Sequence, residues 1–458
     1  VTATISRNGD LVHRMYLEHD GSFTVKDVAQ NNEYAHQLSI VERYGDSLIK
    51  ECEIEIGGQK IDKHTSMWNR VYSDLTEFNP SGYFGRISPP GPADGTLYQK
   101  MTGNAYGFNT GDWSATGNSF GMSYGAEPPA TSTINGISYT RGDGGSTGSA
   151  AKVSVNKLFL PLNFWFNRNP GLALPLIALQ YHEVKVKMTF ESLGNLSRIG
   201  IRQHLNRFNA ATPSTSGDVD TTGKFDLWCD YIYLDTYERR RFAQVSHEYL
   251  IEQLQYSKTN ISSANPSIDL NFNHPVKELV WCMRNETAAE NTGRHCTPAH
   301  VTGDATSGPA SIDKMGGNWQ LKLNGHGRFK ERDTKYFTRT QVWQHHTGYG
   351  GVPTAGLAGI QLNVSLATGE RPILGSDSIA VYSFALKPEE HQPSGTCNFS
   401  RIDNAQLVGS GVTVAQGRTQ TQAPAGMPTT KNIKLTIFAV NYNVLRIMSG
   451  MGGLAYSN

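Results

Sequence analysis

The stretch Ile54-Glu55-Ile56-Gly57-Gly58-Gln59-Lys60-Ile61 alternates apolar and polar side chains, meets two glycines and continues as a short basic and hydrophobic segment. Successive side chains of a β-strand point to opposite faces, so this alternation predicts a strand. The same order returns at residues 321–329, which read Leu-Lys-Leu-Asn-Gly-His-Gly-Arg-Phe. The repetition indicates that the chain contains two similar units.

Two further landmarks occur in the same order in both halves of the chain. Aromatic-bearing strands followed by loops with Pro and Gly are predicted at residues 158–166 and 379–386, and aromatic-rich closing strands at 225–235 and 433–442. Helical periodicity is confined to short segments at 67–75 and 237–244. We therefore predict an all-β protein of two similar consecutive units with long loops and a few short helices, spanning residues 1–240 and 241–458.

Composition excludes several classes of protein. The 458 residues carry 41 Lys and Arg against 40 Asp and Glu, so a surface that binds nucleic acid through bulk positive charge is not expected. Five scattered cysteines without a CxxC pair predict reduced thiols. No apolar run approaches the roughly 18 residues of a membrane span, and the residues after Val1 lack a signal-peptide pattern.

The segment 81–150 holds 15 of the 47 glycines together with nine aromatic residues. Disordered linkers are usually poor in aromatic residues. We therefore expect an ordered loop of the first unit that packs on itself or on a neighbouring chain. Its exposure on the outside of an assembly is a hypothesis.

Motifs that suggest catalysis or metal binding lack their structural context. The Gly-x-Ser-x-Gly pattern at 117–121 has no strand before it and no helix after it, as a hydrolase nucleophile requires. The histidines and cysteine that could bind zinc lack paired spacing: His295, Cys296, His300, His345 and His346. We predict no catalytic residues, no metal and no cofactor.

Three surface motifs have ordinary interpretations. Arg-Gly-Asp at 141–143 is typical of a solvated turn. The three arginines at 239–241 stand beside Asp235 and Glu238, which predicts a salt-bridged connector between the halves. Five Asn-x-Ser/Thr sequons are candidate glycosylation sites, namely Asn195, Asn260, Asn285, Asn363 and Asn398.

Longer runs carry a resemblance to a known family. They include ISRNGDL at 5–11, IGGQKIDKH at 56–64, PGLALPLIALQYHEV at 170–184, HEYLIEQL at 247–254, QPSGTCNFSRIDN at 392–404 and NYNVLRIMSGMGGLAY at 441–456. In these runs the chain resembles the double jelly-roll major capsid protein of nucleocytoplasmic large DNA viruses, most closely the algal virus forms. The runs span nearly the whole chain apart from the long loops.

The resemblance implies that each unit is an eight-stranded jelly-roll β-sandwich, so that the chain holds two consecutive jelly rolls. It also implies a structural protein of the virion shell, assembled in the host cytoplasm. It implies a homotrimer that forms a pseudo-hexagonal capsomer of an icosahedral shell. Further expected partners are neighbouring capsomers, minor capsid and penton proteins, and an internal membrane with indirect contact. Related chains usually carry more residues ahead of the segment matching 5–11, so membrane-side contacts stay unassigned.

Two alternatives compete with this interpretation. A carbohydrate-binding β-sandwich, a spike or lectin, would use aromatic residues of 81–150 as a platform. A β-sandwich glycoside hydrolase would need two carboxylates facing each other across a cleft about 5–10 Å apart. We find no strand that carries such a pair.

Overall fold

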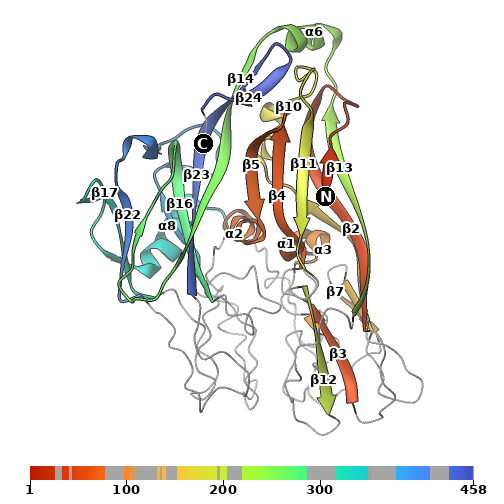
Figure 1. The fold of residues 1–458 in the computed structure, drawn as a ribbon, viewed down its shortest axis with the longest axis vertical. Coiled ribbons are helices and arrows are strands. Elements are labelled where there is room, and N and C mark those ends of the chain that lie inside the picture. Colours follow the sequence, from red (N-terminus) through yellow and green to blue (C-terminus); the bar gives the residue numbers. More distant parts are fainter. Residues whose placement is uncertain are drawn as a thin grey trace.

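The computed structural model shows two β-sandwiches side by side, joined at one end by helix α6 (Thr236–Gln244) (Figure 1). The structure describes residues 1–25, 34–40, 44–77, 97–104, 108–109, 131–134, 137–140, 152–192, 196–203, 219–285, 316–348, 350, 378–412 and 433–456. None of the helices among these residues is long and apolar enough to cross a membrane.

The first sandwich consists of two main sheets and a small third one. Sheet A has the order β1-β11-β4-β5, with β1 (Thr2–Thr4), β11 (Val184–Phe190), β4 (Ile49–Ile56) and β5 (Gln59–Thr65). Sheet B has the order β10-β2-β9-β8-β7, with β10 (Leu174–Pro175), β2 (Leu11–Val25), β9 (Lys152–Pro161), β8 (Ile137–Thr140) and β7 (Thr131–Ile134). Strand β13 (Val219–Ile232) pairs with β2, and sheet C joins β12 (Ser197–Gln203), β3 (Tyr34–Ile40) and β6 (Phe108–Asn109).

The second sandwich has two sheets. Sheet D has the order β14-β23-β16-β20, with β14 (His247–Asn260), β23 (Ile433–Met448), β16 (Pro275–Asn285) and β20 (Ala380–Ser383); β21 (Cys397–Asn398) and β24 (Met451–Leu454) are attached to it. Sheet E has the order β15-β22-β17-β18, with β15 (Ser267–Asp269), β22 (Ala405–Ser410), β17 (Asn318–Leu323) and β18 (His326–Gly327); β19 (Arg332–Asp333) pairs with β17.

The two halves repeat one topology in the same chain order. Sheet A matches sheet E strand for strand, and β13, β2 and β9 of sheet B match β23, β16 and β20 of sheet D. This match pairs all three landmarks of the sequence, so the predicted duplication is confirmed. Among the described strands, the position that β14 holds beside β23 has no counterpart beside β13, whose second edge is open.

The repeated glycine motif forms the same tight turn in both halves. Gly57 and Gly58 have φ of 57° and 85°, and Asn324 and Gly325 have φ of 50° and 79°. Positive φ at both central residues is the conformation that two-residue hairpins favour, and Gly and Asn adopt it readily. The turns therefore connect β4 to β5 and β17 to β18 as antiparallel hairpins.

The short helices begin at polar caps. Helix α2 (Ser66–Thr76) begins after Thr65, whose hydroxyl accepts a hydrogen bond from the Trp68 amide, and α6 begins after Asp235, which accepts one from the Glu238 amide. These helices confirm the predictions at 67–75 and 237–244. The remaining helical segments are α1 (Tyr44–Leu48), α3 (Leu97–Thr102), α4 (Trp165–Arg168), η2 (Pro170–Leu172), η4 (Tyr336–Thr340), α8 (Gln341–His345) and η5 (Phe399–Arg401).

Two predicted strands were too long. The segment 158–166 leaves the sheet after Pro161, and α4 follows at Trp165. Proline cannot donate to a strand ladder, and the helical turn lets Trp165 and Phe166 bury their rings in the first core. The strand predicted at 379–386 likewise ends early, at Ser383.

Three clusters of buried apolar side chains hold the molecule together. One fills the first sandwich and one fills the second. The first cluster also contains Ile251, Leu445 and Ile447, which belong to β14 and β23 of the second sandwich. A third cluster lies between α2 and sheet D. The two sandwiches therefore share buried surface.

Candidate functional site

The described residues offer no enzyme-like site. No group of three or more His, Cys, Asp or Glu side chains among them is arranged to hold a metal ion. Two cavities, one beside Asp46 and His64 and one between the sandwiches, have volumes of about 20 Å³ each. A space of that size holds about one water molecule. The candidate functional site is therefore the junction that fixes the two sandwiches relative to each other.

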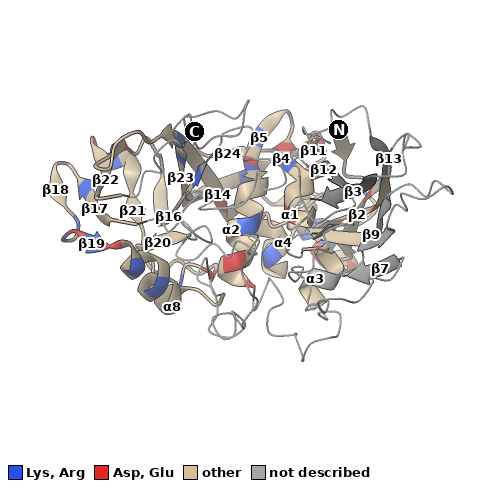
Figure 2. Ribbon diagram, turned by 90° about the horizontal axis from the view of Figure 1, so that it is seen from below, with Lys and Arg blue, Asp and Glu red and all other residues tan. Residues whose placement is uncertain are grey.

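Helix α2 forms the apolar part of this junction. Its residues Met67, Trp68, Val71 and Leu75 recur at helical spacing and form one buried face. That face covers the side of sheet D that points away from the second core. The Trp68 and Phe438 rings lie 5.1 Å apart, and the sulfur atoms of Met67 and Cys282 lie 3.5 Å apart. Figure 2 shows α2 between the two sets of strands.

Hydrogen bonds join the facing strands β5 and β14. The Leu254 amide donates to the Asp62 carboxylate at 2.9 Å, and the Gln253 side chain donates to the Ile61 carbonyl. Nearby, His182 Nδ1 lies 3.0 Å from the Gly452 carbonyl of β24. These contacts satisfy buried polar groups across the junction and fix its register.

Three charges meet at the junction next to these strands; Glu252 and Lys277 are buried, and Arg168 is partly exposed. The Glu252 carboxylate of β14 lies 2.7 Å from Arg168 Nη2 of α4 and 2.6 Å from Lys277 Nζ of β16. Burial favours the protonated acid, but the two facing cations outweigh it and lower the pKa of Glu252. Burial also lowers the pKa of Lys277, which exposes 1% of its side chain. Glu252 thus links the helix of one sandwich to the sheet of the other.

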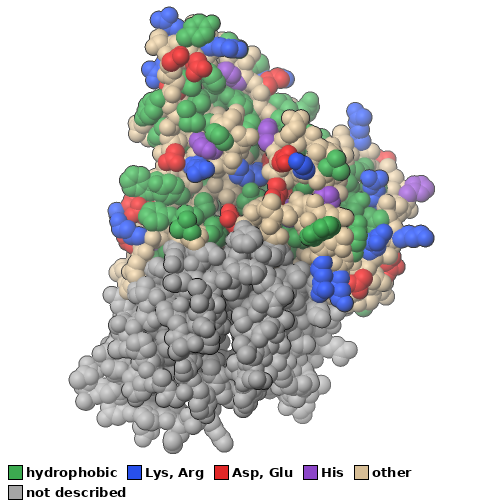
Figure 3. All heavy atoms as spheres, turned by 180° about the vertical axis from the view of Figure 1, so that it is seen from behind, with side chains coloured by type: hydrophobic (Ala, Val, Ile, Leu, Met, Phe, Trp, Pro, Cys, Tyr) green, Lys and Arg blue, Asp and Glu red, His purple; other side chains and the backbone are tan. Residues whose placement is uncertain are grey.

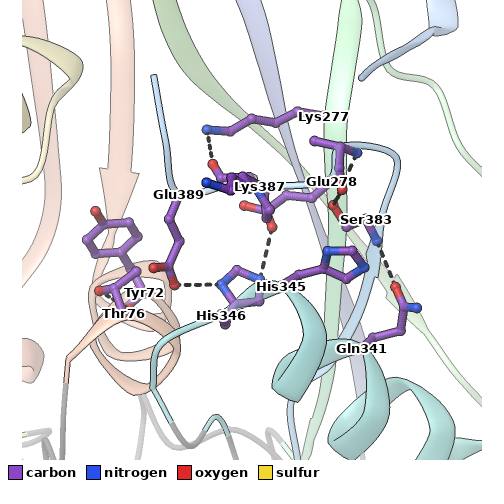
Figure 4. A network of polar contacts seen from close by, with 12 residues as sticks. Tyr72, Thr76, Lys277, Glu278, Gln341, His345, His346, Ser383, Lys387 and Glu389 are labelled. Carbon is purple, nitrogen blue, oxygen red and sulfur yellow. Dashed lines mark hydrogen bonds and ion pairs between the residues drawn. The ribbon is translucent and has the colours of Figure 1, made fainter. Parts of the chain in front are cut away.

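A second polar cluster surrounds His346, which follows α8 (Figure 4). Its Nε2 lies 3.1 Å from a Glu278 oxygen and its Nδ1 lies 3.0 Å from a Glu389 oxygen. Burial opposes protonation, but the Glu278 and Glu389 carboxylates outweigh it and raise the pKa of His346 to about 9. The imidazole is therefore a cation at neutral pH.

The residues after His346 attach this cluster to α2. The Thr347 amide donates to Glu389 at 3.0 Å, and the Thr347 hydroxyl lies 2.9 Å from the Thr76 carbonyl. The amides of Gly348 and Gly350 donate to the carbonyls of Leu75 and Asp74, each at 2.7 Å. The last carbonyls of α2 are thus satisfied by the second sandwich, so the helix end and the His346 cluster depend on each other.

The sequence candidates are distributed as follows. Asn260 is exposed at the end of β14, whereas Asn398 is half-buried and its side chain accepts from the Ser400 amide. Asn285 is the last residue of β16. Asn195 and Asn363 lie outside the described residues, as do His295, Cys296, His300, the Gly-x-Ser-x-Gly pattern, the Arg-Gly-Asp turn and most of 81–150. The described cysteines, Cys52, Cys229, Cys282 and Cys397, are free.

Two expectations about charged residues are resolved by the geometry. Arg239 of α6 does form an ion pair, at 2.8 Å, but with Asp10 of the first sandwich and not with the neighbouring acids. His345 Nδ1 lies 3.1 Å from the Leu386 carbonyl, so the two adjacent histidines take separate partners. Sequence reasoning missed Glu252, Lys277 and Glu278; the signal for the last two was a charged pair placed beside the apolar run of β16.

Comparisons with known proteins agree with this architecture. Residues 238–361 and 365–453 match the family described as large eukaryotic DNA virus major capsid protein, and residues 1–84 and 109–235 match the family described as major capsid protein N-terminus. The chain is 40% identical to the major capsid protein of Pyramimonas orientalis virus, over 100% of this chain and 86% of the relative. It is 34% identical to that of Paramecium bursaria Chlorella virus 1, over 100% and 87%.

Among solved structures, the PBCV-1 virus capsid quasi-atomic model is similar, with a TM-score of 0.60 and 30% identity over 100% of this chain and 92% of that one. The Faustovirus major capsid protein shares the fold, with a TM-score of 0.61 at 14% identity.

Proposed function

Because this chain belongs to the major capsid protein family of large eukaryotic DNA viruses, a family of structural proteins and not of enzymes, we propose that three copies associate into a pseudo-hexagonal capsomer. The observation that carries the proposal is the repeated topology of residues 1–240 and 241–458. Three chains with two similar units each present six similar edges, which suits a hexagonal lattice built from one gene product.

The junction supports this role physically. Helix α2, the Glu252 ion pairs and the His346 cluster hold the two sandwiches in one orientation before any assembly. A preformed angle between the units lowers the conformational entropy lost on association. Capsomers of this design would contact neighbouring capsomers and minor capsid and penton proteins, with indirect contact to an internal membrane, after assembly in the host cytoplasm.

Light scattering on the purified full-length chain tests the proposal. A mass of three times 50.3 kDa, with six-sided outlines in negative-stain electron microscopy, is the expected result. Monomers at micromolar concentration would overturn it, because interfaces of permanent assemblies commonly bury more than about 2,000 Å² and do not dissociate there.

A further inference from the structure

We propose that the outer face of sheet B receives helix α8 of a second copy, and that Trp343 of that helix packs on Tyr16 and Trp228. The proposal rests on the trimer proposed above and names the surfaces that would hold it together. In this contact, α8 of one chain would cover sheet B of another chain, just as α2 covers sheet D within a single chain.

The outer faces of sheets B and D are built alike. In sheet D, Val280 of β16 lies opposite Phe438 of β23; in sheet B, Tyr16 of β2 lies opposite Trp228 of β13. Val280 and Phe438 are fully buried because α2 covers them. Among the described residues, no helix covers the equivalent pair in sheet B.

Sheet B instead exposes an aromatic row. Trp228 is 51% exposed. Tyr16 is half-buried, and its ring lies 5.9 Å from the Phe159 ring of β9 in an edge-to-face arrangement. Three adjacent strands thus contribute one large aromatic side chain each. Exposed tryptophan and tyrosine next to each other are typical of protein interfaces.

Helix α8 is the counterpart of α2. Helix α2 follows the β4–β5 hairpin, and α8 follows the β17–β18 hairpin after β19 and η4. Trp68 is the third residue of α2 and packs on Phe438, whereas Trp343 is the third residue of α8 and is 81% exposed. The preceding residues are fixed, since Val342 is buried and Gln341 accepts from the Ser383 amide at 3.1 Å. A rigid helix therefore presents Trp343 to solvent.

The charges beside the two tryptophans are complementary. Asp226 and Glu18 lie directly opposite each other next to Trp228, and like charges in that position repel. Their own cations, Lys224 and Lys157, are 70% and 68% exposed and so neutralise them weakly. The chain leading to α8 carries the exposed basic residues His326, Arg328, Lys330, Arg332 and Lys335 against the exposed acids Glu331 and Asp333, so its net charge is positive.

The two surfaces belong to different sandwiches. Figure 2 shows β2 and β13 on the outer side of the first sandwich and α8 on the second sandwich. In Figure 3 apolar side chains gather on the edge formed by the first sandwich, and Lys and Arg side chains on the opposite edge. Contact between two different surfaces is head-to-tail, and such contacts close into a ring when the rotation permits.

The variants Trp228→Ala and Trp343→Ala test this contact by light scattering and sedimentation. Truncating a tryptophan at the centre of an interface weakens association by at least about 30-fold, so each variant alone is expected to be monomeric. An equimolar mixture retains one intact contact per pair of unlike chains, so it should yield dimers and no trimers. Tyr237→Ala, at a side chain 78% exposed on α6, is the matched control and should stay trimeric.

The outcomes separate this inference from the proposed function. A trimeric wild type with both variants still trimeric would overturn the inference and leave the capsomer intact. A mixture that regains the trimer would overturn the head-to-tail contact. A monomeric wild type would refute both the proposed trimeric capsomer and this contact. Circular dichroism and melting of each variant show whether the fold is retained, as expected for exposed positions.

Discussion

His346 and Glu278 form a buried ion pair, with 3.1 Å between Nε2 of the histidine and Oε2 of the glutamate and side-chain exposures of 2% and 8%. The pair lies between α8 and β16, and Glu389 and Thr347 connect it to the end of α2. A titratable side chain, His346, therefore lies where the two sandwiches meet. The stability of the junction depends on whether this imidazole is protonated.

The first prediction concerns alkaline pH. The two carboxylates raise the pKa of His346 in the folded state from 6.5 to about 9. Its contribution to stability is therefore complete below pH 6.5 and is lost as the pH rises through 9. We expect the wild-type melting temperature to fall between pH 7 and pH 10 and His346→Gln to show a shallower fall. Equal slopes in thermal scans of both proteins would contradict the assignment.

The second prediction concerns the buried charges. Lys277→Met leaves Glu252 with Arg168 alone, so we expect a loss of about 3–5 kcal/mol in the free energy of unfolding. Lys387→Met removes an exposed pair, 2.8 Å from Glu390, and should leave the free energy of unfolding unchanged within the error of the measurement. Urea titration of both variants measures the change in the free energy of unfolding. Equal changes for the two variants would show that burial does not determine the effect of losing the lysine.

The third prediction compares two tryptophans at equivalent helix positions. Trp68→Ala opens a cavity between α2 and sheet D and should cost about 3–5 kcal/mol of stability. Trp343→Ala removes an exposed ring and should leave the unfolding of an isolated chain within about 0.5 kcal/mol of wild type. Chemical denaturation under conditions that dissociate the assembly measures the change in the free energy of unfolding for each variant. A large effect of Trp343→Ala there would mean that its ring supports the monomer fold.

The fourth prediction concerns the β4–β5 turn. A Cβ atom at Gly57 would lie 2.1 Å from His182 Nδ1, which binds Gly452 of β24, whereas a Cβ at Gly58 meets nothing within 4 Å. Both positions have positive φ, so backbone strain is common to the two alanine variants. We expect Gly57→Ala to destabilise the protein by about 1–3 kcal/mol more than Gly58→Ala, because only the former must displace His182. Equal melting temperatures would refute this.

The fifth prediction concerns glycosylation. Asn260 is exposed, whereas Asn398 is half-buried and caps η5 through its side chain. In a host that glycosylates this chain, we expect sugar on Asn260 and none on Asn398. Peptide mass spectrometry measures occupancy at each site, with Asn260→Gln as the control that removes the modification.

Local patterns predicted the strands and turns well because their causes are local. Alternation from Ile54 onward and the paired Gly57 and Gly58 need only neighbouring residues to define a hairpin. The break of β9 at Pro161 was missed because the aromatic run beyond it has the composition of a strand, and only the position of the core shows that a helical turn buries Trp165.

The junction could not be predicted from the sequence in the same way. Glu252 meets Arg168 and Lys277 across 84 and 25 positions of the chain, and His346 meets Glu278 across 68. Which face of sheet D is covered depends on where α2 lies after the whole chain has folded. Periodicity identifies an apolar face on a helix or strand, but it does not identify the surface that the face contacts.

The first core is completed by Ile251, Leu445 and Ile447. A ribosome delivers the first sandwich long before it delivers residues 445 and 447. During synthesis the first sandwich is therefore left with part of its interior unfilled until residues 445 and 447 have been made and β23 has packed against it. Chains truncated before residue 445 would lack two of these side chains, and their first core would stay incomplete. Such truncated products would therefore fail to fold fully and would be excluded from the shell.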